Sequence, residues 1–109
     1  MTVRIATVQA EATPGAIAQN VARAALFVTE SAAADADLVL FPEAFLTGYD
    51  ETTFTGALPS LADLAWLAPL QDAVEQTGLI AVVNTALDQG DRRTLTDLVL
   101  APDAIPRPA

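Results

Sequence analysis

The apolar positions of the N-terminal part predict a strand, a helix and a second strand. Apolar side chains between residues 3 and 9 indicate a short, mostly buried strand. Thr13 and Pro14 suit the N-cap and first position of a helix, and apolar residues then recur at helical spacing to about Ala33. The uninterrupted apolar run at residues 38–41 is typical of a strand that is covered on both faces and pairs in parallel. This succession predicts a right-handed βαβ unit.

The middle of the chain combines a long connection with a second helical region. Residues 42–59 contain glycines and several threonines and lack clear periodicity, and long connections of this kind often carry function. Ser60 followed by Asp63 resembles a capping box, and a helical pattern continues after it. Pro69 should either kink this helix or open a second one, which ends at Gly78.

The C-terminal part predicts a hairpin. Two apolar segments, residues 79–85 and 95–101, flank a polar turn at residues 88–91 and are expected to pair as antiparallel strands. The tail, residues 102–109, contains three prolines and is expected to be coil. The whole pattern predicts an α/β fold.

The composition fits one packed domain. The chain has 109 residues, of which 52% are hydrophobic and 17% are charged, so a folded core is expected rather than disorder. The mean hydropathy of +0.39 is high for a small domain and indicates an unusually apolar domain or part of a larger body. No apolar run approaches the ~20 residues that a membrane span needs. The N-terminal residues lack the features of a signal peptide, so a cytoplasmic location is expected.

The charged residues exclude several classes of function. Fourteen acidic residues oppose five basic ones, and a net charge of −9 argues against partners such as nucleic acid or an anionic membrane. The chain has neither cysteine nor histidine, which excludes a thiol nucleophile, a thiolate zinc site and a Ser-His-Asp triad within it. The acidic residues around the predicted hairpin do not match a calcium-binding loop. We therefore expect no metal site.

The segment with the most chemical information is LVLFPEAFLTGY, residues 38–49. Pro42 ends the predicted strand and places Glu43 just beyond its carboxyl end, where α/β sheets bind ligands. Apolar neighbours would desolvate the carboxylate, so we expect Glu43 to be partly buried and suited to act as a general base. Alternatively, Glu43 caps a helix or lies in water, which is the commoner role of a lone acid after a strand. Tyr49 either lines a substrate pocket or packs beneath a loop.

These residues carry a resemblance to a known family. The chain resembles the N-terminal part of the nitrilase superfamily, the carbon–nitrogen hydrolases. The most specific match is Phe41-Pro42-Glu43 followed by Leu46-Thr47-Gly48-Tyr49, and Arg4-Ile5-Ala6, Gln9 and Asn20 match as well. Asn84 and Ala104 stand where the family usually has glycine. The resemblance covers nearly the whole chain but only the first part of the family's domain.

The resemblance implies an αββα sandwich with a mixed β-sheet and helices on the outside, usually in homo-oligomers. Family members hydrolyse amides or nitriles, or transfer acyl groups, without a metal or cofactor. Glu43 corresponds to the general base of a Glu-Lys-Cys triad, in which the lysine stabilises the oxyanion and the cysteine forms the covalent intermediate.

The absence of lysine and cysteine leaves this triad incomplete. We interpret residues 1–109 as a partial carbon–nitrogen hydrolase domain that is inactive alone, through a truncated gene, a broken reading frame or a partial chain. Its predicted strands would form at most half of a sandwich, so an apolar sheet face would lack its cover. The alternative is a small α/β ligand-binding module or an acidic interaction module without catalysis.

Overall fold

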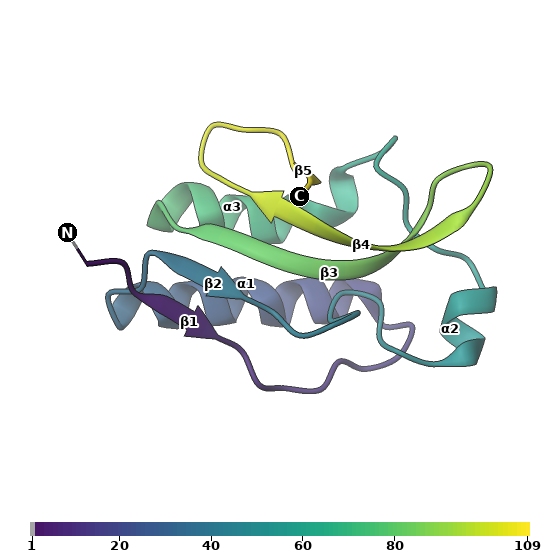
Figure 1. Ribbon diagram of the computed structural model, residues 1–109, viewed down its shortest axis with the longest axis horizontal. Helices are drawn as coiled ribbons and strands as arrows, with labels where there is room; N and C mark the ends of the chain where they lie inside the picture. The colour runs from purple at the N-terminus through teal and green to yellow at the C-terminus, as the bar shows by residue number, and fades with distance from the viewer. Residues whose placement is uncertain (1) are drawn as a thin grey trace.

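The computed structural model describes residues 2–109 as one mixed five-stranded sheet with helices on one of its faces (Figure 1). The strands lie side by side in chain order. They are β1 (Ile5–Thr7), β2 (Leu38–Leu40), β3 (Ile80–Asp88), β4 (Arg93–Leu100) and β5 (Arg107–Pro108). The helices are α1 (Ile17–Ala33), the short α2 (Glu51–Thr55), and α3 (Ala68–Thr77), which follows a single 3₁₀ turn, η1 (Ala65–Leu67).

The pairing of the strands confirms the predicted α/β fold. Strands β1, β2 and β3 are parallel, and α1 connects the first two as the expected βαβ unit. Strands β3 and β4 form the expected antiparallel hairpin, although both are longer at the turn than the sequence indicated. The expectation of a coiled tail is wrong at its end, because β5 pairs antiparallel with β4. Pro108 fits there, since β5 is the edge of the sheet within residues 2–109 and needs no donor on its outer side.

Helix α1 begins later than predicted. Its N-cap is Ala16, whereas Thr13 lies in the preceding loop and does not cap the helix. The cause is Asn20, whose Oδ1 accepts from Thr13 N at 2.9 Å and whose Nδ2 donates to Thr13 O at 2.8 Å. These two bonds hold Thr13 in the loop that precedes the helix.

The second helical region also starts later than the pattern suggested. Ser60 and Asp63 do not form a capping box: Ser60 Oγ accepts from Ala62 N, and Asp63 Oδ1 accepts from Ala65 N, so each side chain closes a tight turn. Pro69 lies in the first turn of α3 and opens it, which was one of the two predicted possibilities. Gly78 ends α3 in the left-handed conformation (φ +77°), as expected.

The core lies between the sheet and the two long helices, which are both behind the sheet in Figure 1. One row of directly paired residues, Ala6, Val39, Ala81 and Leu100, faces the helices, and its members on β2, β3 and β4 are fully buried. Paired neighbours in a sheet point to the same face, so these positions form one layer of the core.

The opposite face of the sheet, which we call the open face, carries apolar residues without a covering layer among residues 2–109. Ile5, Leu38 and Ile80 pair in one row there, and Ile5 and Ile80 keep 55% and 40% of their surface exposed. The adjacent row contains Leu40 and Val82. This matches the expectation that one apolar sheet face lacks its cover in these 109 residues.

Candidate active site

The residues after β2 form a tight turn, residues 43–48, that we call the Glu43 turn. Strand β2 ends at Leu40, so Glu43 lies just past its carboxyl end, as predicted. The expected partial burial of Glu43 is wrong, because its side chain is exposed. The reason is that Phe41 and Phe45 pack with Phe27 of α1, with ring centroids 5.4–6.4 Å apart, instead of enclosing the carboxylate.

Hydrogen bonds to β3 and within the turn itself fix the Glu43 turn. Ala44 N donates to Asn84 Oδ1 of β3 at 2.7 Å, and Gly48 N donates to Ala44 O at 2.7 Å. Thr47 is fully buried, and its Oγ1 accepts from Ala86 N at 3.2 Å. The turn is therefore anchored on β3, the next strand of the sheet.

A second loop, residues 10–15, lies against the Glu43 turn where β1 and β2 both end (Figure 1). Gly15 N donates to Thr47 O at 2.9 Å. Asn20, which is fully buried, adds a bond from its Nδ2 to Leu46 O at 3.2 Å besides its two bonds to Thr13. One asparagine thus joins α1, the loop and the turn. The sequence marked Asn20 only through the family resemblance and indicated no role for it.

Gly48 permits the close approach of these two segments. Its φ is +84°, and an added Cβ would lie 2.4 Å from Pro14 Cα and 3.0 Å from Pro14 N. Only glycine fits a position that combines this conformation with such proximity to a neighbouring backbone.

A cavity of about 380 Å³ lies between the loop and the turn. Its lining residues are Ala10, Glu11, Ala12, Pro14, Glu43, Ala44, Phe45 and Tyr49. The structure thus brings the two residues singled out from the sequence, Glu43 and Tyr49, into one cavity. It adds a second carboxylate, Glu11, which no sequence signal had marked.

Neighbouring side chains support both ends of this cavity. Tyr49 is 63% exposed and packs its ring edge-on against Phe54 of α2 at 5.2 Å, so it both lines the cavity and packs on a helix. Arg23 lies with its guanidinium 5.5 Å from the Phe45 ring and donates to Glu11 O at 2.7 Å. These contacts hold the backbone of Glu11 and the ring of Tyr49 at the rim.

Asp50 begins the helix that carries Phe54. Its Oδ1 accepts from Thr53 N at 2.7 Å as the N-cap of α2. This backbone hydrogen bond holds the pKa of the Asp50 carboxyl below its ordinary value of 3.8. The charged form of Asp50 is therefore the form that orders α2 beside Tyr49.

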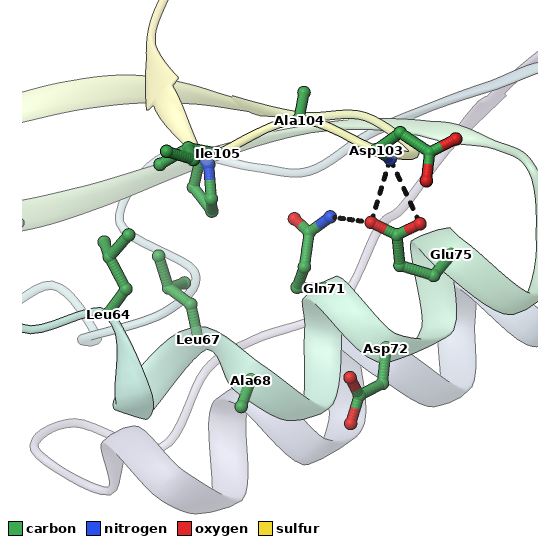
Figure 2. A pocket seen from close by; sticks show the side chains of 10 residues that line it. Leu64, Leu67, Ala68, Gln71, Asp72, Glu75, Asp103, Ala104 and Ile105 are labelled. Atoms are coloured by element: carbon green, nitrogen blue, oxygen red, sulfur yellow. Dashed lines mark hydrogen bonds between the residues drawn. The ribbon is translucent and has the colours of Figure 1, made fainter.

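A larger cavity of about 440 Å³ lies between α3 and the tail (Figure 2). Glu75 accepts there from Asp103 N at 2.9 and 3.1 Å, and Gln71 Nε2 donates to Glu75 Oε1 at 2.7 Å. These bonds tie the tail to α3, and the cavity contains neither residue singled out from the sequence. The chemistry therefore favours the smaller cavity at the ends of β1 and β2 as the candidate site.

Within residues 2–109, no cluster of three or more acidic, histidine or cysteine side chains is arranged to hold a metal ion. No helix in the same range has the length and apolar character required to cross a membrane.

The carbon–nitrogen hydrolase family matches residues 4–105, which is nearly the whole chain. The protein therefore belongs to the carbon–nitrogen hydrolase family. No curated protein matches the chain.

Solved structures share its fold. An amidase from Nesterenkonia sp. is 22% identical over 89% of this chain and 37% of its own, with a TM-score of 0.74. A CN-hydrolase superfamily protein from Xanthomonas campestris is 21% identical over 97% of this chain and 39% of its own, with a TM-score of 0.80. A glutamine-dependent NAD(+) synthetase from Cytophaga hutchinsonii is 16% identical over 98% of this chain and 18% of its own, with a TM-score of 0.73. The chain thus spans well under half the length of these relatives.

Proposed function

We propose that this chain is the N-terminal part of an enzyme that hydrolyses non-peptide C–N bonds of small amides or nitriles. Glu43 is its general base and Tyr49 lines its substrate pocket. The observation that carries the proposal is that Glu43 and Tyr49 share one cavity at the carboxyl ends of β1 and β2 in a member of this family. Pockets in this position, at the ends of parallel strands, are where α/β folds bind ligands.

The proposed reaction proceeds through a covalent intermediate. The Glu43 carboxylate takes the proton of a cysteine thiol, and the thiolate attacks the carbonyl or nitrile carbon. A lysine stabilises the negative charge that develops on the substrate. With an amide, Glu43 returns its proton to the leaving amine, then takes one from the water that hydrolyses the thioester to the acid. The exposed position of Glu43 leaves its carboxylate accessible to both proton donors, the cysteine thiol and the hydrolytic water.

The lysine and the cysteine must come from outside these 109 residues, since the chain has no cysteine and its basic residues are all arginine. Two facts support such an origin. The chain spans 39% of the length of an amidase from Nesterenkonia sp. AN1, and that amidase was solved as a mutant with acrylamide added to its active-site cysteine.

The test compares the 109-residue chain with a polypeptide translated through the coding sequence downstream of residue 109. The longer product should release ammonia from at least one member of a panel of primary amides and nitriles, and the shorter chain should release none. A folded longer product that contains lysine and cysteine but releases no ammonia from any member would contradict the proposal.

A second candidate function is the binding of an amine without catalysis. Glu11 and Glu43 both line the cavity, and no basic residue does, so the cavity suits a positively charged ligand. A primary alkylammonium ion should then raise the melting temperature of the 109-residue chain, and the alcohol of the same length should not. Glu11→Gln and Glu43→Gln should each weaken the effect. Identical responses to the amine and the alcohol would exclude this candidate.

A further inference from the structure

The conformation of Ala44 requires an explanation, because it is unusual for a residue with a side chain. Its φ is +55°, in the left-handed region, and it directly follows Glu43. This region costs free energy for any residue with a Cβ, so neighbouring contacts must stabilise the conformation. Ala44 is fully buried, so its N–H has no access to water and depends on a protein acceptor.

That acceptor is a side chain rather than the backbone. Ala44 N donates to Asn84 Oδ1 at 2.7 Å, across from the turn on β3. The backbone of Asn84 contacts the turn as well, since Leu46 N donates to Asn84 O at 3.5 Å. Asn84 therefore contacts the turn through both its side chain and its backbone.

We propose that Asn84 is a positioning residue for Glu43, acting through the peptide bond that joins Glu43 to Ala44. A peptide unit is planar, so the N–H of Ala44 and the C=O of Glu43 turn together. By holding the N–H, the Asn84 carboxamide fixes the plane of this peptide, and with it the direction in which the backbone presents the Glu43 side chain. The importance of that direction for catalysis rests on the proposed function of Glu43.

Asp97 fixes the orientation of the Asn84 carboxamide. The two residues are directly opposite on β3 and β4, and Asn84 Nδ2 donates to Asp97 Oδ1 at 3.1 Å. A carboxamide has one accepting and one donating end, so the carboxylate on one side leaves the oxygen for Ala44 on the other. Asp97, Asn84 and the Ala44 peptide thus form one chain of hydrogen bonds that ends beside Glu43.

The test measures hydrogen exchange at the Ala44 amide of the 109-residue chain by fragmentation mass spectrometry, which tolerates self-association. In Asn84→Ala the amide loses its acceptor and should exchange about tenfold faster than in the parent, relative to its intrinsic rate. Gln89→Ala is the matched control: it removes the side-chain hydrogen bond to Thr94 at the far end of the same hairpin and should leave Ala44 unchanged.

Swapping the side chains of Asn84 and Asp97 separates a positioning role of Asn84 from a general loss of stability. Asn84→Asp alone places two carboxylates opposite each other and should weaken the protection of Ala44. In the double variant N84D/D97N, the carboxylate at position 84 accepts from Ala44 N, and the carboxamide at position 97 donates to that carboxylate. The protection of the Ala44 amide should therefore return. If Asn84→Ala does not fold, the comparison of Asn84→Asp with the double variant decides by itself. Protection of Ala44 that is unchanged in Asn84→Ala, or that the double variant fails to restore, overturns the proposal.

The longer polypeptide provides the catalytic readout. Asn84→Ala should lower its kcat on the order of tenfold with little change in KM, because the base is misdirected while the pocket remains. N84D/D97N should recover the rate, and an unchanged kcat in Asn84→Ala overturns the positioning role. If the parent polypeptide releases no ammonia, the proposed function fails, and exchange at Ala44 still decides whether Asn84 holds the turn.

Discussion

Replacement of Gly48 by alanine should destabilise the protein more than its backbone conformation alone requires. A residue with a side chain pays roughly 1–2 kcal/mol for the left-handed region. The added Cβ would also lie 2.4 Å from Pro14 Cα and 3.2 Å from Pro14 Cβ, and a change of side-chain rotamer cannot relieve contact with a backbone atom. Forcing extra atoms into a packed site costs typically about 1–3 kcal/mol, so we expect a total loss of roughly 2–5 kcal/mol.

Gly90 provides the matched control. Its φ of +88° is nearly the same, but no atom lies within 4 Å of the position that a Cβ would take. Gly90→Ala should therefore cost only the conformational part, roughly 1–2 kcal/mol. Urea unfolding followed by the fluorescence of Trp66, at one fixed chain concentration, measures both variants. Equal losses of stability in the two variants would refute the close contact between the Glu43 turn and the loop at residues 10–15.

Three further predictions concern the activity of the 109-residue chain, its open face and the N-cap of α2. The 109-residue chain should release no ammonia from any amide, because it has no thiol; ammonia release that Glu43→Gln abolishes would contradict this. The open face should bind a hydrophobic dye or drive self-association, and Ile80→Asp should reduce both; a monomeric parent chain that binds no dye would show that the face needs no cover. The cap of α2 should be fully formed above pH 3.8 and be lost as the pH falls through the lowered pKa of Asp50, as measured by hydrogen exchange at Thr53. Asp50→Asn, a cap that does not titrate, should remove this pH dependence, and an unchanged pH dependence would exclude Asp50 as its origin.

The sequence predicts the elements that local patterns determine. The βαβ unit and the hairpin follow from apolar runs whose spacing matches their structure, and Gly78 ends α3 as its type suggests. The start of α1 does not follow from the N-cap preference of Thr13. The side chain of Asn20 binds the backbone of Thr13 in the preceding loop, and Ala16 is the N-cap instead. Strand β5 depends on pairing with Leu98 and Val99 near the C-terminal end of β4, and Pro108 conceals its strand signal.

In the candidate site, too, local sequence patterns predict some features, and others depend on residues distant in the chain. The position of Glu43 follows from the strand and from Pro42, whereas its exposure depends on Phe27, a residue of α1 that attracts the aromatic neighbours of the carboxylate. The sequence offered no indication that Glu11 lies in the same cavity, since loops bring such residues together only in the folded chain. Short helix α2 has no apolar periodicity that would predict it, although Asp50 followed by Glu51 is a recognisable helix start.

The proposed role of Glu43 as the catalytic base is tested by a comparison of two isosteric variants of the longer polypeptide. Glu43→Gln removes the proton acceptor, and Glu11→Gln removes the same charge from the same cavity. We predict that ammonia release falls by about 10²–10⁴-fold in Glu43→Gln, the usual contribution of a general base, and remains within a few-fold of the parent in Glu11→Gln. Full activity in Glu43→Gln, or an equal loss in both variants, would contradict the assignment of Glu43 as the base.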